Sequence, residues 1–254
     1  MLSIIVVFRI RSQKDHALWD LTAKSINGIL ETADQDYELI IIDNGSLGSD
    51  YTEALVRSSG PWGLLFPHIQ GTRIIRMDRP ESLSKAWNTG VHQADGEYII
   101  LANNDIVYHQ KGWMTRMIEP FDWEDRRIGI VGIQHMSWYK WAFVEGSLFA
   151  IPTSFREMFD LREVPEENDP PYAVVFDEQF TLSCEDVDFN YRVQQAGYET
   201  IQVTGPALQP TYLQHLGHRT IQSLSGTYEN IITITHENRV RLCRKYGYPD
   251  QVVD

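Results

Sequence analysis

Three short polar clusters contain the side chains of this sequence that are best suited to chemistry. Residues 103–105 (Asn-Asn-Asp) follow an apolar run, residues 185–188 (Glu-Asp-Val-Asp) open a segment with helical spacing, and His215 and His218 come later in the chain. Carboxylates, amides and imidazoles are groups that bind divalent cations or move protons. A cation site and a general base are therefore the two chemistries to test.

Each cluster also has a simpler structural interpretation. Mg²⁺ and Mn²⁺ often share a single protein carboxylate with substrate phosphates, which suits residues 103–105, but Asn and Asp are equally common in ordinary turns. Glu185 and Asp186 are suited to a general base, or they cap a helix and complement its dipole. His215 and His218 are candidates to complete a metal site, or they are surface or hydrogen-bonded core residues. The residue types alone leave these alternatives open.

The first hundred residues contain the elements that would position two of these clusters. Runs of β-branched and aromatic residues predict strands at 3–8, 37–42, 72–77 and 96–101. Apolar residues with helical spacing predict a helix between Leu18 and Leu30 and another at 82–94. Strands separated by helices imply βαβ units and a mostly parallel sheet, and ligands bind beyond the carboxyl ends of such strands. Residues 103–105 and 43–46 lie at these ends, where Asp43 would accept a hydrogen bond from a nucleoside or belong to a simple turn.

The second half of the chain is less regular. It contains an aromatic cluster at 138–143, an extended segment at 146–151 and a Pro- and acid-rich loop at 162–171. A helix is predicted to begin near Cys184 and to end at a cap formed by Gly197. A closing helix is predicted at 227–246, and we expect it to pack onto the sheet.

The charge balance limits the classes of partner. The 254 residues include 22 Lys and Arg against 35 Asp and Glu, which gives a formal net charge of −13. Nucleic acids and anionic membranes are bound through basic surfaces, so bulk-charge binding of either is excluded. No apolar run approaches the roughly 20 residues that span a bilayer, and the start of the sequence lacks a signal-peptide pattern. We expect a cytoplasmic protein.

In combination, the clusters and strands resemble the inverting glycosyltransferases of family 2, which have the GT-A fold. The matching segments are 3–8, 37–46 (YELIIIDNGS), 84–90 (SKAWNTG), 94–101 (ADGEYIIL), 145–149 (EGSLF) and 176–198. Residues 103–105 stand in the place of the family's Asp-x-Asp metal motif. The resemblance covers about residues 2–220.

The resemblance implies a single continuous α/β domain of the GT-A (Rossmann-like) type, with a mostly parallel sheet flanked by helices. Residues 1–107 would form the nucleotide-sugar-binding half, and 108–222 the acceptor-binding half that carries the catalytic base. Residues 223–254 would form a C-terminal helical tail.

Individual roles follow from the same resemblance. The catalytic base is expected to be Asp186, with Glu185 as second candidate, and Asp105 and His215 are the expected ligands of Mn²⁺ or Mg²⁺. The aromatic residues Trp138, Tyr139 and Trp141 would form an acceptor platform, or pack in the core or against a subunit. The expected donor-binding residues are Phe8, Arg9, Asp43, Asn44, Lys85, Asn88, Asn103 and Asn104.

Two departures from the family pattern affect the donor site. Only Asp105 of the metal motif is charged, so Asn103 is expected to contact the ribose or the metal through its amide oxygen. The first strand ends in Phe8-Arg9-Ile10-Arg11, where the family commonly has a Pro-Thr-Tyr-like turn, which suggests that Arg9 or Arg11 faces the diphosphate. A chain with a charge of −13 needs a cation and a few basic residues to hold such an anion. Metal dependence is therefore predicted.

The implied reaction is the metal-assisted, inverting transfer of a hexosyl or deoxyhexosyl group from a nucleoside-diphosphate donor to an acceptor hydroxyl. The acceptor would be a glycan, a lipid-linked molecule or a protein, with no nucleic acid partner and no transmembrane segment. A catalytically silent sugar-nucleotide or glycan-binding module on the same fold is the alternative, which the altered metal motif favours. A nucleotidyltransferase is disfavoured, because residues 8–20 contain no glycine for a phosphate-binding loop.

Overall fold

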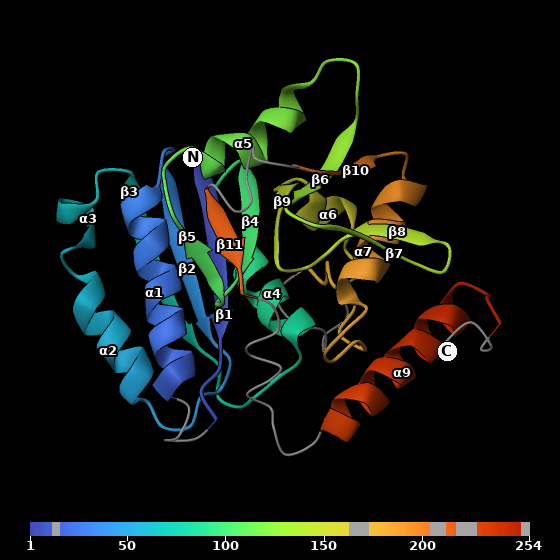
Figure 1. The fold of residues 1–254 in the computed structure, drawn as a ribbon, viewed down its shortest axis with the longest axis horizontal. Coiled ribbons are helices and arrows are strands. Elements are labelled where there is room, and N and C mark those ends of the chain that lie inside the picture. Colours follow the sequence, from blue (N-terminus) through green and yellow to red (C-terminus); the bar gives the residue numbers. More distant parts are fainter. Residues whose placement is uncertain (12–15, 163–172, 204–211, 217–227, 250–254) are drawn as a thin grey trace.

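A seven-stranded sheet forms the centre of the computed structural model, which describes residues 1–11, 16–162, 173–203, 212–216 and 228–249 (Figure 1). The strand order is β10-β6-β9-β4-β1-β2-β3. All neighbouring pairs are parallel except those of β9, which runs antiparallel to both β4 and β6. The bounds are β1 Leu2–Phe8, β2 Tyr37–Asp43, β3 Ile69–Arg76, β4 Tyr98–Asn103, β6 Ile128–Gly132, β9 Leu148–Pro152 and β10 Glu199–Gln202.

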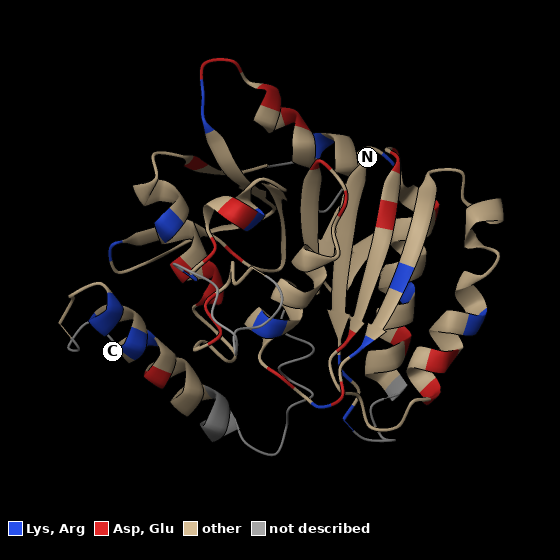
Figure 2. Cartoon of the chain, turned by 180° about the vertical axis from the view of Figure 1, so that it is seen from behind, with Lys and Arg blue, Asp and Glu red and all other residues tan. Residues whose placement is uncertain are grey.

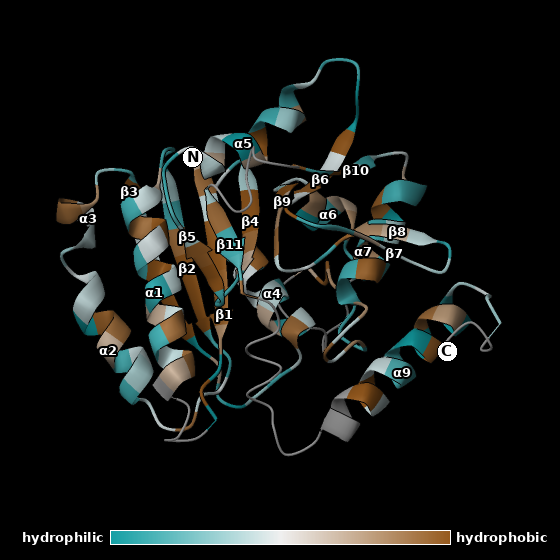
Figure 3. Cartoon of the chain, in the orientation of Figure 1, coloured by the Kyte–Doolittle hydropathy of each residue, from teal (hydrophilic) through white to brown (hydrophobic). Residues whose placement is uncertain are grey.

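Helices cover both faces of this sheet because its central strands are apolar on both sides. Every residue of β1 and β2 is buried, as expected for parallel strands between two helical layers. Alternate residues of β1 enter different cores: Ile4 packs with Ile26 of α1, whereas Ile5 packs with Trp87 of α4. Figure 3 shows the same hydrophobic concentration in the central strands. The helices of this half are α1 His16–Thr32, α2 Asp50–Ser59, α3 Trp62–Leu65 and α4 Leu83–His92.

Two small antiparallel sheets and several helices complete the second half. The strand β11 pairs with β5, and β7 forms a hairpin with β8. The strand bounds are β5 Ile106–Tyr108, β7 His135–Trp138, β8 Trp141–Val144 and β11 Leu213–His215. The helices are α5 Trp113–Ile118, the 3-10 helix η1 Glu119–Asp122, α6 Phe155–Met158, α7 Glu185–Gln195 and α9 Tyr228–Lys245. Within the described segments, no helix is both long enough and apolar enough to cross a membrane.

The predicted mostly parallel α/β sheet is confirmed, with small shifts in the bounds of its elements. The third strand begins at Ile69, ahead of its predicted start, and the helix predicted at 82–94 begins after Ser82. The Ser82 hydroxyl caps this helix by accepting a hydrogen bond of 3.1 Å from the backbone N–H of Lys85. The pairing of β5 with β11 and the β7–β8 hairpin were not predicted. These strands have only three or four residues, too few to show an alternating hydrophobic pattern.

The closing helix is present as α9, but the prediction that it packs onto the sheet is wrong. Leu242 and Cys243 of α9 are buried with Phe143 of β8 and Val187 of α7, in a hydrophobic cluster separate from the two cores that flank the sheet. Figure 1 shows α9 beside α7 and apart from the seven strands. The helix therefore forms a wall of the second half of the molecule.

Candidate active site

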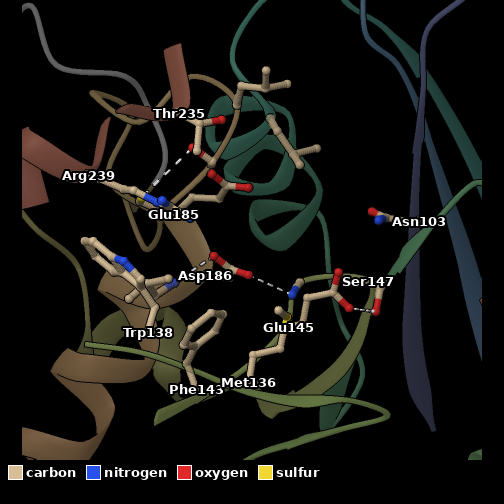
Figure 4. A pocket seen from close by; sticks show the side chains of 16 residues that line it. Asn103, Met136, Trp138, Phe143, Glu145, Ser147, Glu185, Asp186, Thr235 and Arg239 are labelled. Atoms are coloured by element: carbon tan, nitrogen blue, oxygen red, sulfur yellow. Dashed lines mark hydrogen bonds between the residues drawn. The ribbon is translucent and has the colours of Figure 1, made fainter. Parts of the chain in front are cut away.

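A pocket of about 310 Å³ lies between the first turn of α7, the β8–β9 connection and α9 (Figure 4). Its polar lining includes Asn103 at the end of β4, Glu145 after β8, and Glu185 and Asp186 at the start of α7. The fold thus brings the predicted base and one predicted donor residue to a single pocket. The remaining lining is supplied by Leu83, Met136, Trp138, Phe143, Gly146, Ser147, Leu182, Ser183, Cys184, Val187, Thr235 and Arg239.

The Asp186 carboxylate is held in this pocket by backbone groups. The N–H of Gly146 donates to Oδ2 at 2.9 Å, and the N–H of Val187 donates to Oδ1 at 2.8 Å. Burial raises the pKa of Asp186 above the usual range of an aspartate, the two backbone hydrogen bonds oppose that rise, and the nearby charge of Glu145 adds to it. A carboxylate with a raised pKa is a stronger base, which is the property a proton acceptor needs.

Gly146 is needed for this arrangement because no side chain fits at its position. A Cβ added there would lie 2.8 Å from the indole of Trp87 and 3.3 Å from Cβ of Asp186. Cys184, which precedes the helix, has a left-handed backbone conformation with φ of 74° that is uncommon for a residue with a side chain. Such conformations are concentrated at functional sites.

A buried amide fixes the helix that carries Asp186. The Asn190 side chain accepts a hydrogen bond of 2.8 Å from the N–H of Val144 and donates one of 3.1 Å to the carbonyl of the same residue. It also donates to the carbonyl of Asp186 at 2.8 Å. These hydrogen bonds attach the first turns of α7 to β8 and so fix the position of Asp186 in the pocket.

Glu185 is the second unusual carboxyl group of the pocket. Its side chain is buried, and Oε2 has no hydrogen-bond partner among the residues that the structure describes. Burial raises its pKa, and the charge of Asp186 raises it further. Asp186 differs in that two backbone N–H donors oppose the rise of its pKa, whereas Oε2 of Glu185 has no such donor among the described residues.

Asp105 and His215 form the candidate metal pair. His215 lies on β11 opposite Ile106 of β5, and this pairing brings His215 Nε2 within 3.3 Å of Asp105 Oδ1. Both side chains are nearly buried. Burial acts to lower the pKa of His215, but the hydrogen bond and charge of Asp105, with the charge of Glu145, outweigh it and raise that pKa.

The donor types of this pair fit a divalent cation. One carboxylate and one imidazole suit Mn²⁺ and, less fully, Mg²⁺. In the described part of the chain no group of three or more His, Cys, Asp or Glu residues is arranged to hold a metal. A cation held by Asp105 and His215 would therefore take its other ligands from water and from phosphate oxygens.

Asp43 is buried at the end of β2 and is already engaged by protein groups. Its carboxylate accepts hydrogen bonds from the backbone N–H of Ser46 at 2.8 Å and from the Thr52 hydroxyl, and it pairs with Arg76 at 2.7 Å. These contacts close the turn after β2. A contact with a nucleoside stays a prediction.

Four other predicted donor-binding residues contact neighbouring protein groups. Asn88 is fully buried and donates to the carbonyl of Phe176 at 2.8 Å, and Asn44 exchanges two hydrogen bonds with the backbone of Glu81. Asn104 donates to the Thr22 hydroxyl at 2.8 Å, and Phe8 lies in the core against Trp19. These side chains shape the loops around the site, and none of them lines the pocket.

Arg9 and Lys85 remain near the carboxyl ends of the strands. Burial lowers the pKa of Arg9, and its Nε has no hydrogen-bond partner among the described residues. Lys85 pairs with Glu81 at 3.3 Å and lines a second hollow together with Arg76 and Arg79. This hollow lies beside the end of β3, and its lining also includes Asp78 and Glu81. His218 and residues 163–171 of the predicted acid-rich loop lie outside the described residues.

The aromatic cluster is mostly packed rather than open. Trp141 is buried and stacks on Trp138 with ring centroids 4.9 Å apart, and the Arg239 guanidinium lies 5.0 Å from the Trp138 centroid. Tyr139 is exposed, but it does not line the pocket. Core packing therefore describes Trp141 better than an acceptor platform does. Trp138 lines the pocket, and its ring is in contact with Trp141 and Arg239.

Five polar residues of the pocket received no role from the sequence: Glu145, Ser147, Ser183, Thr235 and Arg239. Glu145 was part of a matched segment but received no role, and its signal was its position beside the family's acceptor-side strand. Thr235 and Arg239 come from α9, and nothing in their spacing indicates that this helix reaches the pocket. Figure 2 shows the resulting arrangement, in which acidic residues of the α7 region face basic residues of α9.

Comparison with known proteins decides the family. The sequence model of Glycosyl transferase family 2 matches residues 3–178, which is more than half of the chain. The chain belongs to this family. A curated relative, the uncharacterised protein y4gI of Sinorhizobium fredii (strain NBRC 101917 / NGR234), is 33% identical over 101 residues. That alignment covers 38% of this chain and only 10% of the relative.

Solved glycosyltransferases share the fold. The mannosyltransferase PcManGT of Pyrobaculum calidifontis, solved with GDP-Man and Mn²⁺, has a TM-score of 0.54 and 15% identity over 79% of this chain and 54% of its own. GalNAc-T7, solved with UDP, GalNAc and Mn²⁺, has a TM-score of 0.58 and 16% identity over 82% of this chain and 46% of its own. TarS of S. aureus has a TM-score of 0.55 and 12% identity over 95% of this chain and 39% of its own. The family 2 chain thus has the GT-A fold and spans about half the length, or less, of these proteins.

Proposed function

We propose that this chain is an inverting glycosyltransferase that moves a hexosyl or deoxyhexosyl group from a nucleoside-diphosphate donor to an acceptor hydroxyl, with help from Mn²⁺ or Mg²⁺. The observation that carries the proposal is Asp186, a pocket-facing carboxylate held by two backbone N–H groups, with a pKa raised by burial. Membership of family 2 supports the reaction class.

Asp186 acts as the general base. The acceptor oxygen attacks the anomeric carbon while the bond from that carbon to the diphosphate breaks, and the hydroxyl proton passes to the Asp186 carboxylate. The N–H groups of Gly146 and Val187 hold both carboxylate oxygens in place, so the base is positioned before the acceptor arrives. Attack from the side opposite the leaving group inverts the anomeric centre.

Asp105 and His215 serve the other end of the reaction. They would hold a divalent cation, which neutralises the charge that builds up on the departing diphosphate. Asn103, on the same turn as Asp105, lines the pocket and is suited to contact the donor. Arg9 and Lys85 are the basic residues that we assign to the phosphates. In this account residues 1–107 bind the donor, 108–222 carry the base and bind the acceptor, and 223–254 form the tail.

The test is the release of nucleoside diphosphate from a panel of UDP- and GDP-sugars, with Mn²⁺ or with EDTA. Two solved neighbours were crystallised with GDP-Man or UDP together with Mn²⁺, which makes these nucleotides the first probes. We expect metal-dependent release from at least one donor. Binding of a donor without release, even with simple sugars added as acceptors, would instead support a catalytically silent sugar-nucleotide-binding module.

A further inference from the structure

The helix α9 supplies one wall of the pocket, although it lies beyond the segment that matches the family. Thr235 and Arg239 are one helical turn apart, so they project from the same face of α9, and both line the pocket (Figure 4). The family match ends at residue 178. The reaction chemistry described above gives no role to either residue of this wall.

The wall is fixed by hydrogen bonds along the length of α9. Asn238 donates to the carbonyl of Ser183 at 3.1 Å, beside the first turn of α7. Lys245, the last residue of α9, pairs with Asp188 at 2.6 Å, and the hydroxyl of Tyr246, just after the helix, donates to the same carboxylate at 2.7 Å. A side chain on this face of α9 is consequently held at a defined place relative to Asp186.

Arg239 is the basic residue of the pocket, and its charge is not neutralised within the described part of the chain. It forms no ion pair there, whereas Arg76, Arg192 and Lys245 each pair with a buried aspartate. Its guanidinium instead lies over the ring of Trp138, which is itself stacked on Trp141. Stacking of this kind orients the planar guanidinium and leaves its N–H donors free for a ligand.

We propose that Arg239 binds an anionic group of the acceptor, a phosphate or a carboxylate. In Figure 4 Asp186 lies between Arg239 and Asn103, so Arg239 is on the side of the base away from the donor residues. A guanidinium matches phosphate and carboxylate oxygens through paired hydrogen bonds. The pocket also holds three acidic residues, Glu145, Glu185 and Asp186, which repel an anion. The positive charge of Arg239 offsets this repulsion. The inference rests on the proposed transferase function.

Ligand-observed NMR titrations test this proposal without knowledge of the natural acceptor. The probes are glucose, glucose 6-phosphate and glucuronate, added to the full chain with diamagnetic Mg²⁺ and saturating nucleoside diphosphate, so that the donor site is blocked. Wild type should bind one of the two anionic sugars about 10- to 100-fold more tightly than glucose. Preference for the phosphate or for the carboxylate identifies the group.

Three variants make the result specific. Arg239→Met should weaken binding of the preferred anionic sugar far more than binding of glucose and so remove the preference, while Arg239→Lys should keep part of it. Arg244→Met, which removes an exposed arginine from the last turn of the same helix, should retain the full preference. An equal affinity for the three sugars in wild type, or a preference that survives in Arg239→Met, would overturn the proposal. Failure of nucleotide release would count against the transferase function and is read in a separate assay.

Discussion

Two regions of the molecule hold buried or half-buried carboxylates at the end of an element, and they treat the charge differently. At the end of β2, Asp43 meets the guanidinium of Arg76 and the hydroxyl of Thr52. At the start of α7, Asp186 meets only backbone N–H groups, and Oε2 of Glu185 has no partner among the described residues. Burial alone therefore does not distinguish a structural carboxylate from a chemical one. The presence of a compensating cation does.

The same contrast occurs within α7 itself. Asp188 follows Asp186 by two residues and is fully buried, but it pairs with Arg192 at 2.9 Å and with Lys245 at 2.6 Å. It also accepts a hydrogen bond from the Tyr246 hydroxyl. Asp188 thus fastens α9 to α7, whereas Asp186 faces the pocket. The two residues form a matched pair for experiments.

The largest effect is expected from Asp186→Asn. The amide retains the shape of the side chain but cannot accept the proton, so we expect nucleoside diphosphate release to fall by about 10²- to 10⁴-fold. Calorimetric titration should show that Mn²⁺-dependent binding of the nucleotide is unchanged. Equal loss of binding and release would show that Asp186 has a structural role like that of Asp43.

Asp188→Asn should have the opposite profile. The substitution leaves Arg192 and Lys245 without their carboxylate, and loss of one partner of a buried ion pair costs about 3–5 kcal/mol of unfolding free energy. Urea denaturation of the two variants side by side gives the comparison. Asp186→Asn is expected to lose less, about 1–3 kcal/mol, because its amide nitrogen replaces one of the two oxygens that accept a backbone N–H. A stable Asp188→Asn protein would remove the distinction between the two residues.

The metal pair should be next in size. Asp105→Asn and His215→Gln each remove one of the two protein ligands, and loss of even an outer partner of a metal site typically costs about 10- to 100-fold in affinity. Titration of Mn²⁺ in the nucleotide-release assay should show at least that change in the half-saturating concentration. An unchanged value would place the cation elsewhere in the donor site.

A smaller effect concerns the pH dependence of stability. Because burial raises the folded-state pKa of Glu185, the folded protein loses stability as pH rises from the ordinary glutamate value toward that raised value. Glu185→Gln removes this cost. The variant should melt about 2–4 °C above wild type near pH ~8, for a gain of ~1 kcal/mol, with a much smaller difference near pH ~5. A constant difference across this range would show that Glu185 ionises normally.

The sequence was a good guide to the sheet and to the order of the polar clusters. Continuous apolar runs such as 37–42 predicted buried parallel strands, because only strands covered on both faces are apolar on both sides. It was a poor guide to which polar side chains are free for a ligand. Asn88 matches the family motif, but it bonds to Phe176, whose position no local pattern reveals.

The position of α9 was equally hidden. Helical spacing predicted the helix, but its place depends on Asp188 meeting Lys245 and Tyr246, which are distant in sequence. For that reason α9 was predicted to pack on the sheet, and nothing in the sequence indicated that Arg239 lines the pocket. Contacts of this kind are visible only once the chain is folded.

The stereochemistry of transfer tests the central claim most directly. With a donor that supports nucleotide release, proton NMR of the first sugar released to water, recorded before mutarotation, gives its anomeric configuration. In the proposed mechanism Asp186 acts as a base opposite the leaving group, so an α-linked donor should first give the β sugar, and Asp186→Asn should abolish the signal. Release of the α sugar first would contradict a single-displacement mechanism with Asp186 as its base.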